Sequence, residues 1–215
     1  MPGPDLNLEQ VMAEVRGLFR DADLDDPALE ARILVSGLLD LELTALITRA
    51  REVIPAEKIE RIRAAAVRRV ASEPVYRILG WREFYGLRLK LSKGTLEPRP
   101  DTEVLVDAML PLLRVMVGQG LKPRVLDLGT GTGAICLALL HEVPEASGVG
   151  TDISDDALAT AKANADRNGL GTRFGTVHSD WFSQVRGRFD VIVSNPPYIP
   201  SANIAGLDRE VREHD

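Results

Sequence analysis

The sequence predicts an α/β fold with a doubly wound parallel sheet, preceded by a small helical bundle. Apolar residues recur at helical spacing over residues 5–73, whereas strand-like and helical segments alternate from residue 124 onward. The composition agrees with a folded protein, because 45% of the 215 residues are hydrophobic and 27% are charged. This length suits one large domain or two modest ones, and the change of pattern favours two.

The N-terminal segment is expected to form three helices and no strand. The first helix carries one apolar stripe, made by Leu8, Val11, Met12, Val15, Leu18 and Phe19. The second begins at Asp26-Pro27, where an acidic N-cap precedes a proline at the first helical position. The third begins at Pro55. Glu73-Pro74 closes the bundle, because the residue before a proline is pushed out of helical geometry.

Strand-like alternation first appears at residues 81–91, centred on Tyr85-Gly86, and predicts a β-hairpin linker. The next helix is expected to carry its apolar residues at Val104, Leu105, Ala108, Met109 and Leu112. Strands are then predicted at residues 124–128, 147–151, 173–177 and 189–194, with helices at 134–142 and 155–168. We therefore expect a bundle over residues 1–74, a linker over 75–97 and an α/β domain over 98–215.

The composition argues against several classes of protein. The 26 Lys and Arg residues against 32 Asp and Glu residues give a net charge of −6, which disfavours bulk nucleic-acid binding. No apolar stretch approaches the roughly 20 residues of a membrane span, and the N-terminus does not read as a signal peptide. One cysteine, Cys136, and three histidines form neither an internal disulfide nor a zinc cluster. We expect no bound metal, no membrane contact and a cytoplasmic location.

A glycine-rich turn joins the first strand of the α/β domain to the following helix. It reads Asp127-Leu128-Gly129-Thr130-Gly131-Thr132-Gly133-Ala134. Such a turn lets a nucleotide-like ligand approach backbone amides at a helix N-terminus. Asp152 ends the second strand, where an acid that binds ribose hydroxyls belongs. The turn alone leaves the cofactor open, and a tight connection without a ligand is the alternative.

A second motif follows the fourth strand and reads Ser194-Asn195-Pro196-Pro197-Tyr198. Two prolines fix the backbone, so that the Asn195 side chain and the Pro196 carbonyl present two acceptor oxygens at one point. These acceptors match the two protons of a planar amino group, on which Tyr198 can stack. The motif therefore predicts a nitrogen nucleophile as substrate, and a proline-containing loop without such a role is the alternative.

With these two motifs the sequence resembles class I S-adenosylmethionine-dependent methyltransferases that act on amino groups of planar substrates. Adenine-N6 methyltransferases and release factor glutamine methyltransferases, the PrmC/HemK family, share the Asn-Pro-Pro-Tyr motif. Residues 73–80, 83–87, 98–103 and 180–182 resemble the second family. The resemblance is continuous from about residue 74 to residue 199, and the helical N-terminal segment agrees with it in character.

The resemblance implies S-adenosylmethionine as cofactor and a role for particular residues of this chain. The cofactor would contact the glycine turn, the acid that binds its ribose hydroxyls, the residues that border its adenine and the residue after the last strand. These residues are Asp127, Gly129, Thr130, Gly131, Gly133, Asp152, Asp180, Trp181 and Asn195. The substrate would contact Asn195, Pro196, Pro197, Tyr198 and Arg99, and the catalytic residues would be Asn195, Pro196 and Tyr198. Glu103 either lines the pocket wall or serves as a first-turn helix acid.

The function implied by the resemblance is methylation of the glutamine in the Gly-Gly-Gln motif of peptide-chain release factors, docked by the helical bundle. An adenine-N6 nucleic-acid methyltransferase and a non-catalytic module that binds release factors are the alternatives. The family's sheet has more strands than the four found here, so we expect the α/β domain to be truncated after the fourth strand. Residues 189–194 would then form an unprotected sheet edge.

Basic residues gather in the second half of the bundle. They are Arg49, Arg51, Lys58, Arg61, Arg63, Arg68 and Arg69. A solvated helix face is one interpretation, and a docking site for an acidic partner or ribosomal RNA is the other.

Overall fold

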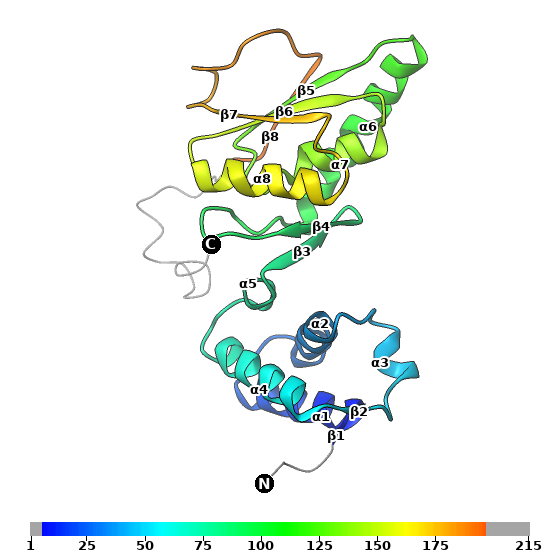
Figure 1. The fold of residues 1–215 in the computed structure, drawn as a ribbon, viewed down its shortest axis with the longest axis vertical. Helices are drawn as coiled ribbons and strands as arrows, with labels where there is room; N and C mark the ends of the chain where they lie inside the picture. Colours follow the sequence, from blue (N-terminus) through cyan, green and yellow to red (C-terminus); the bar gives the residue numbers. More distant parts are fainter. Residues whose placement is uncertain (1–5, 197–215) are drawn as a thin grey trace. The chain divides into compact units, whose positions relative to one another are not determined.

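The computed structural model describes residues 6–196, which form two compact units, residues 6–79 and 80–196 (Figure 1). The first unit is helical, and the second contains a four-stranded parallel sheet and a hairpin. Each unit encloses its own cluster of buried apolar side chains. The predicted fold class, an α/β domain after a helical N-terminal region, is confirmed.

The first unit is built from helices whose starts follow local sequence signals. Its helices are α1 (Leu8–Asp21), α2 (Pro27–Leu39), α3 (Ala45–Thr48), α4 (Ala56–Val70) and α5 (Val75–Leu79). Asn7 and Gln10 form a capping box at the start of α1, each side chain accepting the other's backbone N–H at 2.9 Å. Asp26 caps α2 by accepting the N–H of Leu29 at 3.0 Å, as the sequence predicts.

The expectation of no strand in this segment is wrong. Strands β1 (Leu6–Asn7) and β2 (Val53–Ile54) form one short antiparallel pair. Two residues are too few for alternation to show, and the pairing joins segments about 47 positions apart, which no local pattern encodes.

Four of the seven clustered basic residues form ion pairs inside this unit. The pairs are Arg49–Glu52, Arg63–Glu14, Arg63–Glu60, Arg68–Glu73 and Arg69–Glu30. Arg69 is also buried, at 6% exposure. A large part of the cluster's positive charge is therefore compensated within the unit, and Arg69 does not belong to a solvated face.

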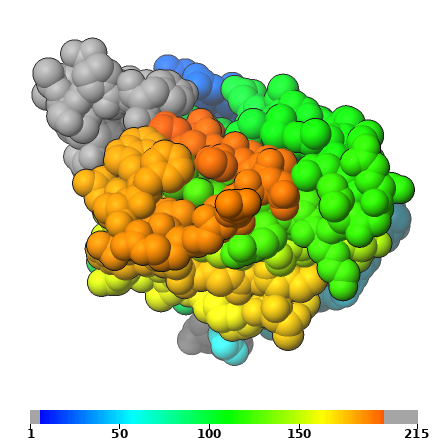
Figure 2. Space-filling view, turned by 90° about the horizontal axis from the view of Figure 1, so that it is seen from above, coloured from blue at the N-terminus to red at the C-terminus, as the bar shows by residue number. Residues whose placement is uncertain are grey.

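The second unit contains the four predicted parallel strands in the order β7-β6-β5-β8. Strand bounds differ from the predicted ones by two residues at most: β5 (Arg124–Leu128), β6 (Ser147–Asp152), β7 (Phe174–His178) and β8 (Val191–Ser194). Within residues 6–196, β8 pairs with β5 alone and ends the strand order. The orange segment that includes β8 forms much of the surface seen in Figure 2.

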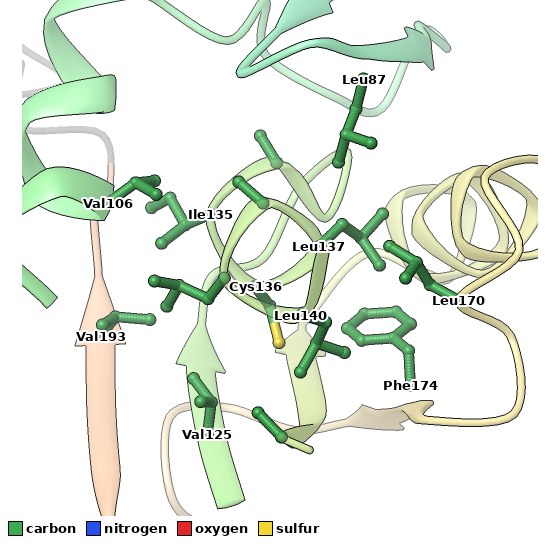
Figure 3. Close-up of a cluster of buried hydrophobic side chains, with 14 of the residues drawn as sticks. Leu87, Val106, Val125, Ile135, Cys136, Leu137, Leu140, Leu170, Phe174 and Val193 are labelled. Atoms are coloured by element: carbon green, nitrogen blue, oxygen red, sulfur yellow. The ribbon is translucent and has the colours of Figure 1, made fainter. Parts of the chain in front are cut away.

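Helix α7 (Ala134–Glu142) is the centre of the second core. Every residue from Ala134 to Leu140 is buried, as expected for a helix that is apolar on all sides. Figure 3 shows its side chains meeting the hairpin residue Leu87, the strand residue Val125 and Phe174 of β7. Helix α8 (Asp155–Arg167) covers the sheet beside it, in contact with β6 and β7.

The close approach of α7 to the sheet depends on a glycine in β6. A Cβ at Gly148 would lie 2.3 Å from the Sγ of Cys136, whose sulfur points toward the sheet in Figure 3. We expect Gly148→Ala to lower the free energy of unfolding by about 1–3 kcal/mol through overpacking. Urea unfolding measures this loss.

Two further variants test the cause of that loss. Gly175→Ala on β7 is the matched control, because a Cβ there meets nothing within 4 Å. Adding Cys136→Ala to Gly148→Ala removes the clashing sulfur and should recover most of the stability. Equal losses for Gly148→Ala with and without Cys136→Ala would show that the contact does not limit packing.

The predicted hairpin is present as β3 (Trp81–Phe84) and β4 (Leu87–Lys90). Its two-residue turn, Tyr85-Gly86, has positive φ at both positions (50° and 75°), as type I′ hairpin turns require. Phe84, Leu87 and Leu89 are buried in the core of the second unit. The hairpin is thus part of that unit's packing.

A 3-10 turn, η1 (Pro100–Thr102), leads into helix α6 (Glu103–Gly118), where only Leu105 and Met109 of the predicted apolar residues pack against the core, both partly buried. Val104 and Leu112 are 69% and 47% exposed, and the buried residues are Val106, Leu110 and Leu113. The helix is apolar around most of its circumference, so spacing alone allows two stripes. Packing against α7 selects the one that is buried.

In the part of the chain that the structure describes, no helix is both long enough and apolar enough to span a membrane.

Candidate functional site

The carboxyl ends of the four parallel strands gather the predicted site residues at one edge of the sheet. Strand β5 lies between β6, to which the chain runs next through α7, and β8, which follows later in the sequence. Ligands in open parallel sheets bind at such a reversal of strand order. The register places Ser194 opposite Leu128, and the Ser194 Oγ donates to the Leu128 carbonyl at 2.8 Å. The two sequence motifs therefore begin side by side.

The glycine turn is folded by its own hydrogen bonds. Gly129, Gly131 and Gly133 have φ values of 67°, 55° and 84°, which other residues rarely adopt. The N–H of Gly133 donates to the carbonyl of Thr130 at 2.8 Å. A Cβ at Gly129 or Gly131 would meet no protein atom within 4 Å, so the turn is open on the side where a ligand would approach.

Asp152 ends β6 and supports this turn. Its Oδ2 accepts the N–H of Gly131 at 3.0 Å, and its Oδ1 accepts the N–H of Ser154 at 3.0 Å. Each carboxylate oxygen retains a further acceptor site, so hydroxyl groups of a sugar can still bind. The sequence predicted the position of this acid but not its second role in holding the turn.

Asp127 lies beneath the turn and is 1% exposed. Its Oδ2 accepts the hydroxyl of Thr130 at 2.8 Å, and its Oδ1 has no hydrogen-bond partner among the described residues. Burial raises the pKa of Asp127 from its ordinary value of 3.8 to about 7, against the opposing effects of the Thr130 hydroxyl and the Cys136 amide. Asp127 therefore supports the turn from below through its bond to Thr130.

The segment after β7 presents an exposed aromatic side chain. Trp181 is 52% exposed and has a positive φ of 48°. The buried Ser179 fixes this backbone, because its Oγ donates to the Trp181 carbonyl at 2.8 Å and accepts the N–H of Gln184 at 3.0 Å. Asp180 precedes the tryptophan and is exposed. This geometry leaves the indole ring available for stacking on a planar ligand.

Asn195 follows β8 and is held by a residue 93 positions earlier. Its Nδ2 donates to the Oγ1 of Thr102 at 2.9 Å. Because this bond uses the amino end of the amide, Oδ1 remains available as an acceptor. Thr102 is fixed in turn by its N–H, which donates to the Arg99 carbonyl at 3.0 Å.

These groups fit an adenosine-containing cofactor. A carboxylate for sugar hydroxyls, an open glycine turn before the uncapped N-terminus of α7, and an exposed indole lie at the ends of neighbouring strands. Among residues 6–196, no group of three or more His, Cys, Asp and Glu side chains is placed to hold a metal ion.

Comparison with known proteins identifies the family. The chain matches the methyltransferase small domain over residues 102–206 and the PrmC N-terminal domain over residues 10–80. It is 52% identical to the release factor glutamine methyltransferase of Agrobacterium fabrum, over 99% of this chain and 74% of that protein. The chain belongs to the release factor glutamine methyltransferase family.

Other relatives agree with this assignment. The release factor glutamine methyltransferase of Bradyrhizobium diazoefficiens is 49% identical over 97% of this chain and 70% of its own length, and that of Deinococcus radiodurans is 38% identical over 98% and 73%. Among solved structures, the ribosomal protein L11 methylase of Lactobacillus delbrueckii subsp. bulgaricus has 31% identity and a TM-score of 0.39 over 46% of this chain and 47% of its own.

Most of the site residues predicted from the sequence lie among the described residues. The structure gathers Asp152, the glycine turn, Trp181 and Asn195 at the carboxyl edge of the sheet. Pro196 is the last described residue, and Pro197 and Tyr198 lie outside the described residues. Arg99 reaches this site through its backbone, by way of Thr102.

The contacts of Glu103 favour one of its two interpretations, a first-turn helix acid, over a residue of the pocket wall. Glu103 lies in the first turn of α6, and its Oε1 accepts the N–H of Tyr85 at 2.9 Å. It is therefore a first-turn acid that also fixes the hairpin turn.

Ser179 and Asn164 were not predicted from the sequence. Ser179 fixes the backbone at Trp181, and Asn164 bonds to the carbonyl of Thr132 in the glycine turn. Asn164 did leave a signal, because asparagine is disfavoured inside helices and here stands in an alanine-rich helix. Ser179 left none.

Proposed function

We propose that this chain methylates the side-chain amide nitrogen of the glutamine in the Gly-Gly-Gln motif of peptide-chain release factors, with S-adenosylmethionine as methyl donor. The names of its relatives support a glutamine of a release factor as the substrate. The single observation that carries the proposal is the anchoring of Asn195 by Thr102 beside the start of the glycine turn. An acceptor oxygen is thereby held next to the proposed cofactor site.

The chemistry required of the chain follows from the substrate. An amide nitrogen is a weak nucleophile because its lone pair is delocalised into the carbonyl. When bound, S-adenosylmethionine supplies a methyl group on a sulfonium sulfur, which the amide nitrogen takes as the carbon–sulfur bond breaks. Asn195 Oδ1 and the Pro196 carbonyl accept hydrogen bonds from the two N–H groups of the substrate amide. These bonds return electron density to the nitrogen and hold it in line with the carbon–sulfur bond. Neither group takes a full proton, so the proton leaves to water after transfer.

Transfer of a radiolabelled methyl group to purified release factor tests the proposal. We expect label on the Gly-Gly-Gln glutamine, located by mass spectrometry, and only one methyl group per glutamine. A methylated amide retains one N–H, which cannot satisfy both acceptors. Label on DNA adenine with release factor untouched, or a dimethylated glutamine, contradicts the proposal.

The alternative functions make different predictions in the same assay. An adenine-N6 methyltransferase would label nucleic acid, which the net charge of −6 disfavours. A non-catalytic module would retain release factor in a pull-down without transferring label. We assign the docking of the release factor to the helical bundle of residues 1–74. With release factors as partners, we also assign the reaction to the cytoplasm, where translation ends.

Replacing Asp152 by alanine is expected to weaken cofactor binding strongly. The change removes the proposed ribose contacts and the support of the Gly131 amide, at a cost of about 1.5–3 kcal/mol, or roughly 10- to 150-fold in affinity. Calorimetric titration with S-adenosylhomocysteine measures the loss. Asp166→Ala, an exposed acid on α8, is the control. Tight binding of NAD and none of S-adenosylhomocysteine by the unaltered protein contradicts the assignment of the cofactor.

A further inference from the structure

Asn164 is a fully buried polar residue on α8 with no part in the proposed chemistry. Its exposure is 0%, and alanines stand on either side of it in the sequence. A buried amide carries four hydrogen-bonding sites, and leaving them unpaired is costly. The position therefore needs partners that lie outside its own helix.

Those partners are main-chain groups of two segments far apart in the sequence. Oδ1 of Asn164 accepts the N–H of Lys90 at 2.7 Å. Nδ2 donates to the carbonyl of Lys90 at 3.1 Å and to the carbonyl of Thr132 at 2.9 Å. Because a backbone N–H only donates and a carbonyl only accepts, these partners allow the amide one orientation.

On one side, Asn164 completes the outer edge of the hairpin. Lys90 ends β4 and lies opposite Trp81 of β3. Both of its main-chain groups are bonded to the Asn164 side chain, which thus takes the place that a third strand would occupy.

On the other side, Asn164 holds the glycine turn. Thr132 stands between Gly131 and Gly133 and is 3% exposed. The peptide group that joins Thr132 to Gly133 is fixed at both ends, by Asn164 at the carbonyl and by the Thr130 carbonyl at the N–H. Without the first bond, a buried carbonyl loses its partner, and the flexible glycine lets this peptide rotate.

We propose that Asn164 is a positioning residue that couples strand β4 to the glycine turn, so that the shape of the turn depends on the hairpin. The proposal rests on the proposed cofactor site for its effect on binding, although Asn164 makes no contact with the cofactor. The buried side chain of Asn164 would thus stabilise one conformation of a turn that contains three positive-φ glycines.

The experiment compares Asn164→Ala with Asn168→Ala. Asn168 also ties α8 to β4, because its Nδ2 donates to the Arg88 carbonyl at 3.3 Å, but it does not reach the turn. Amide hydrogen exchange of the free protein is the first readout. We expect Gly133 to exchange at least about tenfold faster in Asn164→Ala and at the unaltered rate in Asn168→Ala.

Calorimetry with S-adenosylhomocysteine is the second readout, at a temperature well below unfolding of every variant. We expect binding about tenfold weaker for Asn164→Ala and within about twofold of the unaltered protein for Asn168→Ala. Lys90→Pro is a second variant, which keeps Asn164 but removes the N–H that it accepts. The coupling predicts faster exchange at Gly133 in this variant as well.

The outcomes separate this proposal from the proposed function. Unchanged exchange at Gly133 in either Asn164→Ala or Lys90→Pro overturns the coupling, as does an equal effect of Asn168→Ala. Failure of the unaltered protein to bind S-adenosylhomocysteine overturns the proposed cofactor instead. In that case the exchange rates of the free protein still decide whether Asn164 couples the two segments.

Discussion

Asn195→Ala is expected to lower turnover by about 100- to 1000-fold while cofactor affinity changes far less. Loss of one positioned hydrogen-bonding group typically costs about 2.7–4 kcal/mol in the transition state. The proposed function assigns the lost acceptor oxygen to the substrate amide, because the other end of the Asn195 amide is bound to Thr102. Steady-state methylation of release factor together with calorimetric titration of S-adenosylhomocysteine separates the two quantities.

Asn195→Asp is the matched variant for this prediction. It keeps the shape and an acceptor oxygen but adds a negative charge beside the proposed sulfonium. That charge stabilises the cationic ground state more than the transition state, in which positive charge leaves sulfur. Turnover should fall while cofactor affinity holds or rises. Equal losses of turnover and affinity in both variants would instead assign Asn195 to cofactor binding alone.

Asp127→Asn is expected to abolish a decrease in the free energy of unfolding that the unaltered protein shows as the pH rises from 4 to 8. In the folded protein the pKa of Asp127 is about 7, against an ordinary value of 3.8, because the carboxyl is buried. The folded state therefore binds the proton more tightly than the unfolded state. Its contribution to stability is fully present below about pH 4 and is lost as the pH rises through 7.

The size of this effect follows from the gap of about three pH units. At about 1.36 kcal/mol per unit, the unaltered protein loses up to roughly 4 kcal/mol between pH 4 and pH 8, and the asparagine variant does not. Any cost of the new amide N–H is the same at every pH, so the difference between the two proteins isolates the carboxyl.

Urea unfolding of the free protein at pH 4.5 and pH 8 measures this difference. Asp101→Asn is the control, because that carboxylate is exposed on η1. A stability difference between Asp127→Asn and the unaltered protein that stays constant with pH would mean that Asp127 is ionised in the folded state throughout.

Local patterns determined the longer helices and the four parallel strands of this protein, and the edge of the sheet at which the predicted site lies. Period-3.6 and period-2 spacing arise from neighbours along the chain, so the helix over residues 134–142 and the strand over 124–128 were predicted with the bounds observed. Because parallel strands end at a common edge, the sequence alone predicts that the glycine turn, Asp152 and Asn195 lie together.

Tertiary structure alone decided which faces and side chains hold that site. The apolar circumference of α6 left its buried face undetermined until α7 packed against it. The contacts of Asn195 with Thr102 and of Asn164 with Lys90 and Thr132 join positions 93, 74 and 32 residues apart. A hydrogen bond between such distant positions forms only when the elements that carry them pack together, and the spacing of residues along the sequence does not predict it.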